Sequence, residues 1–538
     1  MEVYLKNLSL ENLINVLNDL KIDPFLVLKA SSITLASLGL YYLGKIWYSY
    51  RFFKSRGLTG PEHEFFYGNF RELIKNKNYS EVVREWTKKY GKTYGYFEGH
   101  LPVIVTSDLE LIQEVFIKQS TIFSARKKSP LNRRDDDPNA NLFLSTRGRW
   151  KRMRMIMNPT FSSVKLRELG SILVTCADRL IDVLNKDGDT ELNVSEYFKR
   201  FTMDSIWNCA FGVDINMQYE KENEYFTKCE EIFKSTSNLN FPQLIGVYLH
   251  ETKELVLECL ILIMRFLALF VDSRKLLPFI WLHQKIGDIV KHRENEKDIK
   301  KKDYIQLLID AKAELDEKNF HYSDVKKVLT SKEVESNLVL FMLAGYETTS
   351  TTLSYTSHVL VTHPEEQNKL YNEISSVFGS ELGEINSESV QELQYLDWFV
   401  REVLRFYPIA NSVVARRATK RTTIKGIDIP VDTPIAVDVL SVHFDSDNWG
   451  PVDPEVFYPQ RHEVKRNPLA FMTFGNGPRN CIGMKFALIE LKIALVKLIL
   501  NFEFLPLKDQ KNEIELEEGA VRYPKNGVKV LLKKRVHQ

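Results

Sequence analysis

One loop of the sequence surrounds a cysteine with residues that bend the backbone: residues 474–483, FGNGPRNCIG. Its three glycines and one proline let a bulky, flat group approach closely. An amphipathic helix is predicted over residues 484–500, so Cys481 lies at a helix N-terminus, which favours a thiolate. Arg479 is suited to bind an anion such as a carboxylate. A lone thiolate suits a single axial bond to the metal of a haem; the plainer alternative is a buried cysteine after a turn.

A second chemical segment is AGYETT, residues 344–349, within a stretch (331–360) whose period predicts one long helix. Gly345 costs roughly 1 kcal/mol against alanine in a helix interior. Thr348 can donate back to the carbonyl of Ala344 and loosen the turn. A loosened turn with a hydroxyl and a neighbouring acid, Glu347, can hold O2 and supply protons. A buried helix with a packing glycine is the alternative.

Two residue pairs have helical spacing. Glu402 and Arg405, at i,i+3, form an ion pair of a kind that usually lies at a surface and contributes a few tenths of a kcal/mol. Trp150 and Arg154, at i,i+4, share one helical face. A basic surface helix with one core tryptophan would have the same pattern.

Taken together, these motifs resemble those of the cytochrome P-450 family. The pattern FxxGxRxCxG at residues 474–483 is similar to the family's haem-ligand loop, and AGYETT is similar to its oxygen-binding motif, AGx(D/E)TT. The resemblance implies haem b with Cys481 as its axial thiolate, and a catalytic proton relay of Thr348 and Glu347. It also implies that the cofactor contacts Phe474, Arg479, Ala344 and Gly345.

The resemblance assigns further residues to the haem propionates. Trp150, Arg154 and Arg126, the last in FSAR at 123–126, match positions that the family uses for this purpose. Close relatives often place another propionate arginine where this chain has Ser412. Whether one of the arginines at 416–417 replaces it is left open.

The resemblance also gives the Glu402–Arg405 pair a structural role. In the family such a pair joins an arginine from a later segment, here Arg461 in PEVFYPQRH, 454–462. His462 stands where many members have phenylalanine. The motifs occur in the family's order over roughly residues 60–535. Segments such as GYETTSTTLSY and NCIGMKFAL most resemble the animal microsomal clan, which includes liver drug- and steroid-oxidising enzymes, thromboxane synthase and insect detoxifying enzymes.

The elements that must position these residues are mainly helical. Helical period fills most of residues 148–375, a hairpin is predicted over 91–107, and strands are predicted over 423–439 and near 527–533. No long linker or repeat divides the chain. We expect a mainly α fold with a smaller β portion, forming one cytochrome P-450 catalytic domain over residues 61–538.

The composition of the 538 residues excludes several classes of protein. Only 24 Gly and 19 Pro, with 44% hydrophobic residues, exclude collagen-like and mostly disordered chains. A net charge of +2 gives no support to nucleic acid as a partner. The five cysteines include no CxxC pair, which excludes a disulfide framework and suits a reducing compartment.

An apolar stretch near the N-terminus predicts a membrane anchor. Residues 25–44 carry one charge and span one hydrocarbon core as a helix. The tail, 1–24, is acidic on balance and the linker, 45–60, is basic, so the tail is expected in the lumen and the main domain in the cytosol. We therefore expect a single-pass protein of the endoplasmic reticulum. A signal peptide and a core helix are the alternatives. Residues 255–271 form a second apolar stretch, expected to be buried or to dip into the membrane.

Three functions remain open at this point. The first is a monooxygenase that takes electrons from NADPH through a membrane-bound reductase and inserts one atom of O2 into a lipophilic substrate. The second is a haem-thiolate isomerase of a peroxide, which needs no threonine relay, and the third is a non-enzymatic haem sensor. The pocket walls are expected to include Phe341, Ala344, Thr348, Val413, Val414 and parts of 233–275. The polar stretch 131–141 is either part of the access route or a surface loop.

A basic patch is expected to receive the reductase. It comprises Arg147, Arg149, Lys151, Arg152 and Lys485. Arg152 lies about 200° around the helix from the Trp150 face, and we expect it to be free to meet an acidic partner.

Overall fold

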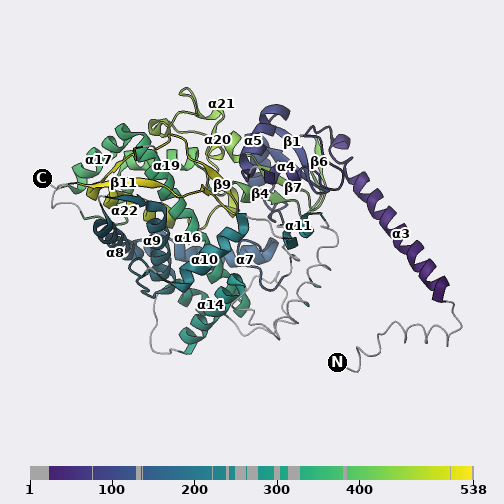
Figure 1. The fold of residues 1–538 in the computed structure, drawn as a ribbon, viewed down its shortest axis with the longest axis horizontal. Helices are drawn as coiled ribbons and strands as arrows, with labels where there is room; N and C mark the ends of the chain where they lie inside the picture. Colours follow the sequence, from purple (N-terminus) through teal and green to yellow (C-terminus); the bar gives the residue numbers. More distant parts are fainter. Residues whose placement is uncertain are drawn as a thin grey trace.

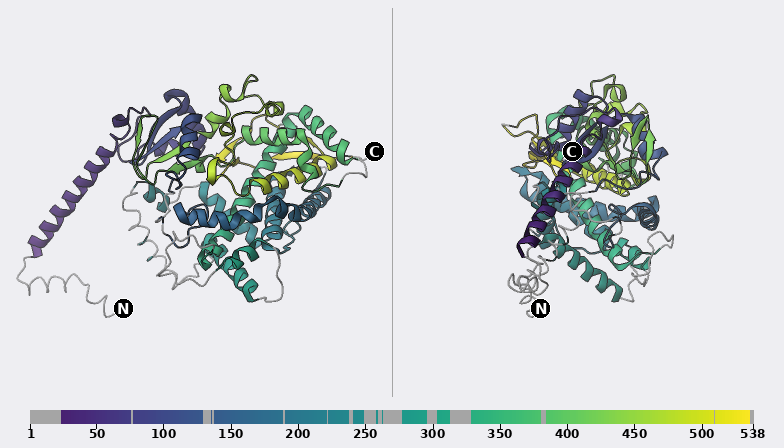
Figure 2. Two further views of the ribbon diagram at one scale, coloured as in Figure 1. Left: turned by 180° about the vertical axis from the view of Figure 1, so that it is seen from behind. Right: turned by 90° about the vertical axis from the view of Figure 1, so that its right-hand side faces the viewer.

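The computed structural model describes residues 24–535, apart from 76, 129–134, 136, 189, 221, 238–240, 249–257, 259–261, 263–276, 296–302, 313–327, 380–383 and 509. One helix, α3 (Pro24–Ser49), stands out from the body of the molecule (Figure 1). Small sheets lie next to its inner end, and most of the helices lie beyond them (Figure 2). The mainly α fold with a smaller β portion is therefore confirmed.

The longest helix, α16 (Ser331–Thr362), crosses the helical body and ends two residues beyond the predicted boundary. Thr330 and Glu333 begin it with a reciprocal capping box, and Pro364 opens the next helix directly after it. It packs against α9 (Val194–Ile206), α14 (Pro278–Asn295) and α22 (Met484–Asn501). The other α-helices are α4 (Phe70–Lys75), α5 (Tyr79–Tyr90), α6 (Leu109–Gln113), α7 (Arg147–Met157), α8 (Ser163–Asp187), α10 (Glu224–Ser237), α11 (Phe241–Tyr248), α15 (Tyr304–Asp310), α17 (Pro364–Phe378), α18 (Ser389–Glu392), α19 (Gln394–Phe406), α20 (Val439–His443) and α21 (Ser446–Trp449).

Sheets form where the alternating segments were predicted. The hairpin of β1 (Thr93–Glu98) and β2 (Leu101–Thr106) belongs to a four-stranded sheet of order β1-β2-β7-β4, which adds β7 (Pro434–Val437) and β4 (Ala415–Arg417). β2 pairs in parallel with β7, while the other two pairs are antiparallel. The remaining sheets are β3-β11-β8, β10-β9 and β5-β6, built from β3 (Glu191–Asn193), β5 (Thr422–Ile424), β6 (Ile427–Ile429), β8 (Phe502–Leu505), β9 (Leu516–Glu518), β10 (Arg522–Pro524) and β11 (Lys529–Lys534).

The close packing of α16 on α9 explains the glycine of the AGYETT segment. A Cβ atom on Gly345 would lie 2.2 Å from Cδ1 of Ile206. That separation is far below van der Waals contact, so the end of the Ile206 side chain would have to shift. Gly345 therefore leaves room for Ile206 of α9, which is the packing role that the sequence left open as the alternative.

The inner end of α3 is packed onto the domain. The helix continues to Ser49, five residues past the expected Gly44, and Phe53 is 6% exposed in the core beside the four-stranded sheet. Tyr50 donates to the carbonyl of Gly99 at 3.2 Å, and Arg56 donates to Asp428 at 2.9 Å. Residues 45–60 are thus part helix and part docked chain. Among the described residues, α3 is the one helix long and apolar enough to span a membrane.

Two other expectations fall largely outside the described residues. Of residues 255–271, only Glu258 and Leu262 are described, and of 131–141, residues 131–134 and 136 are not. The structure therefore does not test whether the first stretch dips into a membrane or whether the second forms an access route.

Candidate functional site

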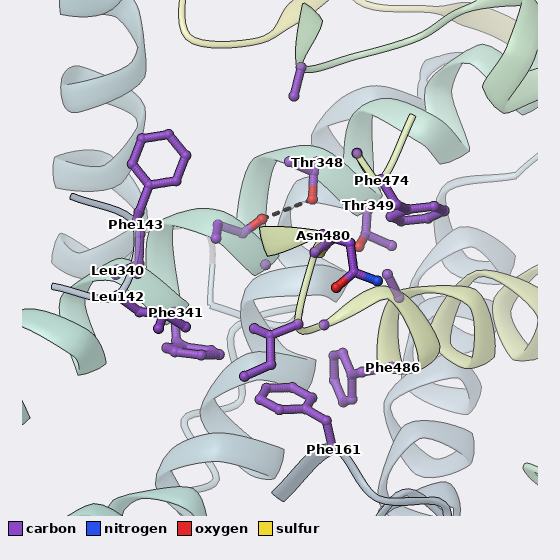
Figure 3. A pocket seen from close by; sticks show the side chains of 18 of the residues that line it. Leu142, Phe143, Phe161, Leu340, Phe341, Thr348, Thr349, Phe474, Asn480 and Phe486 are labelled. Carbon is purple, nitrogen blue, oxygen red and sulfur yellow. Dashed lines mark hydrogen bonds between the residues drawn. The ribbon is translucent and has the colours of Figure 1, made fainter. Parts of the chain in front are cut away.

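A cavity of about 330 Å³ lies where α16, α7 and the loop before α22 meet (Figure 3). Its lining is mostly apolar and includes Phe341, Val413 and Val414, as predicted. None of the lining residues comes from the described part of residues 233–275, which were expected to contribute. Tyr304, from α15, was not foreseen: its ring centroid lies 4.5 Å from that of Phe341. No spacing in the sequence indicates that α15 reaches this cavity.

Cys481 faces this cavity from the tip of its loop. The loop closes on itself because the Cys481 backbone N–H donates to the carbonyl of Phe474 at 2.8 Å. Gly477 has a φ of 72°, and a Cβ on it would lie 2.0 Å from the carbonyl oxygen of Phe116, so only glycine fits. Of the four cysteines that the structure describes, Cys481 is the exposed one, because its side chain opens onto the cavity.

The electrostatic surroundings of Cys481 act in two directions. Burial raises the pKa of its thiol, while the backbone of Gly483 and the charges of Arg154 and Arg126 lower it. A metal ion bonded to the sulfur would add a further, larger stabilisation of the thiolate. The position thus favours a thiolate ligand once a metal is present.

Four arginines line the same cavity: Arg126, Arg154, Arg416 and Arg479. Within the described part of the chain, no aspartate or glutamate lines it with them. The Nε atoms of Arg126 and Arg479 are buried without a hydrogen-bond partner among the described residues. Burial lowers the pKa of Arg126, Arg416 and Arg479, and in each case repulsion from other arginines of the cavity lowers the pKa further. Cations gathered in this way need an anion, and the two carboxylates of a haem fit that need.

Of the two arginines at 416–417, Arg416 is the one that lines the cavity. It lines the cavity, whereas its neighbour Arg417 donates to Asp135 at 2.6 Å and pairs with Asp432. Ser412 itself is not among the lining residues. The chain thus supplies an additional cavity arginine four residues later than the expected position.

The remaining predicted contacts of the cofactor also meet here. Trp150 and Phe474 line the cavity, and the guanidinium carbon of Arg479 lies 5.0 Å from the Trp150 ring centroid. Arg154 donates to the Asn480 carbonyl at 2.7 Å, which ties α7 to the cysteine loop. Arg479 donates to carbonyls of the segment before α7, including that of Ser145 at 2.9 Å. The cavity arginines therefore also hold its walls together.

Thr348 and Glu347 lie on different sides of α16. Thr348 lines the cavity with Ala344 and Gly345, and its hydroxyl donates to the Ala344 carbonyl at 2.8 Å, as predicted (Figure 3). Glu347 instead lines a second cavity of about 350 Å³, where Lys199 Nζ lies 3.5 Å from its Oε1. Burial raises the pKa of Glu347, and Lys199 partly offsets this. The structure does not bring Glu347 to the cavity wall.

The predicted Glu402 cluster is assembled away from the cavity. Glu402 accepts from Arg405 Nε at 2.9 Å and from Arg461 Nε at 2.8 Å. His462, a departure from the family's usual phenylalanine, joins the cluster with its Nε2 3.0 Å from Glu402. Although burial raises the pKa of Glu402, the hydrogen bonds from Arg405 and His462 outweigh it and lower the pKa to about 2.

The prediction for Arg152 is wrong. Its side chain is 2% exposed, and its guanidinium lies 2.6 Å from Oε1 of Glu333. Arg149 is also buried and donates to the same oxygen at 2.8 Å. The carboxylate at the start of α16 attracts both guanidiniums inward, so they are unavailable to a docking partner. Arg147, Lys151 and Lys485 do lie on the surface.

This second cluster could not be found from sequence spacing. Glu333 is 184 residues from Arg149 and 181 residues from Arg152. The only signal in the sequence is the capping pair of Thr330 and Glu333, which places a carboxylate at a helix start. The cluster fixes α7, and with it Trp150 and Arg154, against the beginning of α16.

Comparison with known proteins agrees with this geometry. Residues 58–532 match the family described as Cytochrome P450. The chain is 30% identical over 491 residues to cytochrome P450 3A11 of Mus musculus, covering 88% of this chain and 91% of the relative. It is 30% identical over 499 residues to the putative cytochrome P450 cyp-13B1 of Caenorhabditis elegans, with 90% and 96% covered. It is 29% identical over 528 residues to cytochrome P450 3A5 of Homo sapiens, with 96% and 97% covered. The chain belongs to the cytochrome P450 family.

Proposed function

We propose that the protein is a membrane-anchored monooxygenase that inserts one atom of O2 into a lipophilic substrate. Family membership makes it an oxidoreductase and implies a haem on a cysteine thiolate. The observation that supports the monooxygenase activity is the lining of one cavity, which combines Cys481, four arginines and Thr348 with apolar walls. Each of these groups has a separate task.

The cofactor in this proposal is haem b. Cys481 would bind its iron, and Arg126, Arg154, Arg416 and Arg479 with Trp150 would hold its carboxylates. Phe474, Ala344 and Gly345 line the same space. When bound, the haem supplies the activation of O2, to which the thiolate contributes electron density. The unpartnered Nε atoms of Arg126 and Arg479 support this assignment, because two carboxylates would satisfy them.

Thr348 and Glu347 handle protons in this proposal. The Thr348 O–H donates to the Ala344 carbonyl, so its oxygen is free to accept a hydrogen bond from a group in the cavity, and the hydroxyl must turn away from Ala344 to donate its proton to that group. Burial raises the pKa of Glu347, which favours its protonated form, and the neighbouring Lys199 partly offsets this. It lies in the second cavity, so its proton must pass around α16 to reach Thr348.

The substrate is a lipophilic small molecule. Phe341, Val413 and Val414 offer contact area without hydrogen bonds, which favours apolar surface and excludes water from the reaction. In this proposal α3, which is long and apolar enough to span a membrane, anchors the protein in a lipid bilayer, where such molecules concentrate. We assign it to the endoplasmic reticulum membrane, with a single span, the tail in the lumen and the domain in the cytosol, where an NADPH-dependent reductase supplies electrons.

The two alternative functions, a peroxide isomerase and a haem sensor, differ from a monooxygenase in their use of NADPH and O2. An isomerase of a peroxide substrate needs no electrons, and a haem sensor consumes neither NADPH nor O2. Incubation of the full chain with a microsomal reductase, NADPH and lipophilic candidates separates the three. We expect NADPH and O2 consumption with an oxygenated product; isomerised peroxide without NADPH use would contradict the proposal.

The ligand assignment has its own test. The ferrous carbon-monoxide complex of the wild type should show the red-shifted Soret band of thiolate ligation, and Cys481→Ser should lose it. A Cys209→Ser control should keep the band. Retention of the band by Cys481→Ser would assign the iron to another cysteine.

A further inference from the structure

One buried histidine, His443, connects the Glu402 cluster with the segment that leads into the cysteine loop. It ends α20 and is 0% exposed. Its Nδ1 lies 2.9 Å from the carbonyl oxygen of Arg405, which belongs to the cluster. Its Nε2 accepts from the backbone N–H of Met472 at 2.8 Å. The proposed function assigns no role to this side chain.

These two hydrogen bonds determine which ring nitrogen carries the proton. A backbone N–H can only donate, so the Nε2 that faces Met472 is the unprotonated nitrogen. The one proton of the neutral ring is then on Nδ1, which donates to the Arg405 carbonyl. Burial lowers the pKa of His443 to about 3, against the opposing effect of its hydrogen bond to the Arg405 backbone. At neutral pH the ring is therefore uncharged, with a donor on one side and an acceptor on the other.

Further contacts hold the imidazole in this orientation. The Arg405 guanidinium returns a hydrogen bond to the His443 carbonyl at 2.7 Å. The ring lies nearly parallel to that of Phe471, with an interplanar angle of 6° and 5.7 Å between the centroids. The Trp449 ring meets it edge-on, with the centroids 6.4 Å apart. Because both the backbone and the ring of His443 are held, Met472 faces an acceptor whose place is fixed.

A short series of backbone hydrogen bonds leads from Met472 to Cys481. The Met472 carbonyl accepts from the N–H of Gly475 at 2.8 Å, which turns the chain at the start of the loop. The Phe474 carbonyl, between them, accepts from the N–H of Cys481 at 2.8 Å. Met472 itself is 0% exposed, so its N–H has no solvent to replace His443 as a partner. The position of Met472 thus bears directly on that of Cys481.

We propose that His443 is a positioning residue for the haem ligand. By accepting from the Met472 N–H it fixes the start of the cysteine loop, and with it the place of Cys481 at the cavity wall. His443 does not line the cavity, so it acts through the loop. Without this acceptor the Met472 N–H is buried and unsatisfied, which favours loop positions that reach another partner. The proposal rests on Cys481 as the ligand of the proposed function.

Two amide variants separate the two hydrogen bonds of His443. His443→Gln can place its side-chain carbonyl near the former Nε2, so it can still accept from Met472. His443→Asn is one methylene shorter, so its amide can donate to Arg405 in place of Nδ1 and does not reach Met472. Both variants remove the ring and its stacking, so each serves as the control for the other. We expect both to lower the unfolding temperature.

The measurement is the ferrous carbon-monoxide spectrum of the folded, haem-loaded full chain, followed over time. We expect His443→Asn to lose the thiolate band several-fold faster than the wild type, and His443→Gln to lose it at close to the wild-type rate. Equal rates in the two variants would mean that His443 stabilises the fold alone, and would overturn the proposal. A wild type without the thiolate band would overturn Cys481 as the ligand, and the proposed function with it.

Hydrogen exchange of the unaltered full chain tests the bond itself and needs no variant to fold. The Met472 N–H should exchange as slowly as that of Val403, which is buried within α19. An N–H of Met472 that exchanges as fast as those of exposed loops would mean that no fixed acceptor holds it. That result would overturn the proposal even if neither amide variant can be recovered.

Discussion

Two buried clusters in this chain have the same charges and differ in how the sequence builds them. In one, Glu402 binds Arg405 from its own helical turn and Arg461 from 59 residues later. In the other, Glu333 binds Arg149 and Arg152, which precede it in the sequence by 184 and 181 residues. The first joins α19 to the segment before the cysteine loop. The second joins α7, a cavity wall, to the start of α16. A motif at i,i+3 reveals the first, and only the fold reveals the second.

The largest expected effect is that of Glu402→Ala. It leaves two buried guanidiniums and His462 without their carboxylate, a loss on the order of 3–5 kcal/mol. We expect little soluble, folded protein, measured by recovery and thermal unfolding. Glu392→Ala, on the exposed side of the neighbouring α18, is the control and should unfold like the wild type. Normal stability of Glu402→Ala would show that the cluster does not stabilise the fold.

The next largest effect is expected for Arg152→Glu, which tests whether Arg152 acts in the buried cluster or at a docking surface. Arg152→Glu places a second carboxylate beside Glu333 in a buried site, so it should destabilise the fold by several kcal/mol. We expect a lower unfolding temperature and weaker haem retention as α7 shifts. Double substitution to Arg152→Glu with Glu333→Lys restores opposite charges and should recover part of the loss. Slower reductase turnover with unchanged stability would instead favour the docking role.

The acid dependence of stability separates Glu402 from Glu490. The pKa of Glu402 is depressed to about 2 in the folded state, so its contribution is full above the unfolded value of about 4.5 and is lost as pH falls toward 2. The pKa of Glu490 is raised to about 8, so its burial costs nothing below about pH 4.5 and costs progressively more up to pH 8. Unfolding free energies between pH 3 and pH 9 should therefore show Glu490→Gln gaining on the wild type as pH rises. A constant difference across that range would contradict the raised pKa.

The smallest effect concerns the exposed cations. Lys485 lies on the surface just after the cysteine loop, and Lys485→Glu should leave stability within about 0.5 kcal/mol of the wild type. It should slow reductase-supported turnover at low salt, with the difference shrinking as salt rises. Peroxide-supported turnover is the control and should not change. Equal loss in both assays would place the damage in the cavity.

Local patterns predicted most of the fold and the cavity floor. The period of residues 331–360, the alternation at 91–107 and the glycine loop around Cys481 each depend on neighbours in the chain, and each formed as expected. Tyr304 was missed, Arg152 was misplaced and the choice between Arg416 and Arg417 stayed open, because the surroundings of these residues come from distant segments. The inward turn of Arg152 follows from Glu333, and nothing within four residues of Arg152 signals that carboxylate.

The docked end of α3 decides where the chain can be shortened without harm. A form that starts at residue 45 keeps Phe53 against Gly95 and Arg56 on Asp428, so it loses the apolar part of α3 and little else. A form that starts at residue 61 uncovers the apolar surface beside the four-stranded sheet and leaves Asp428 with Arg421 alone among its described cations. Residues 45–60 are therefore part of the domain's own packing, and we expect the domain to be less soluble without them.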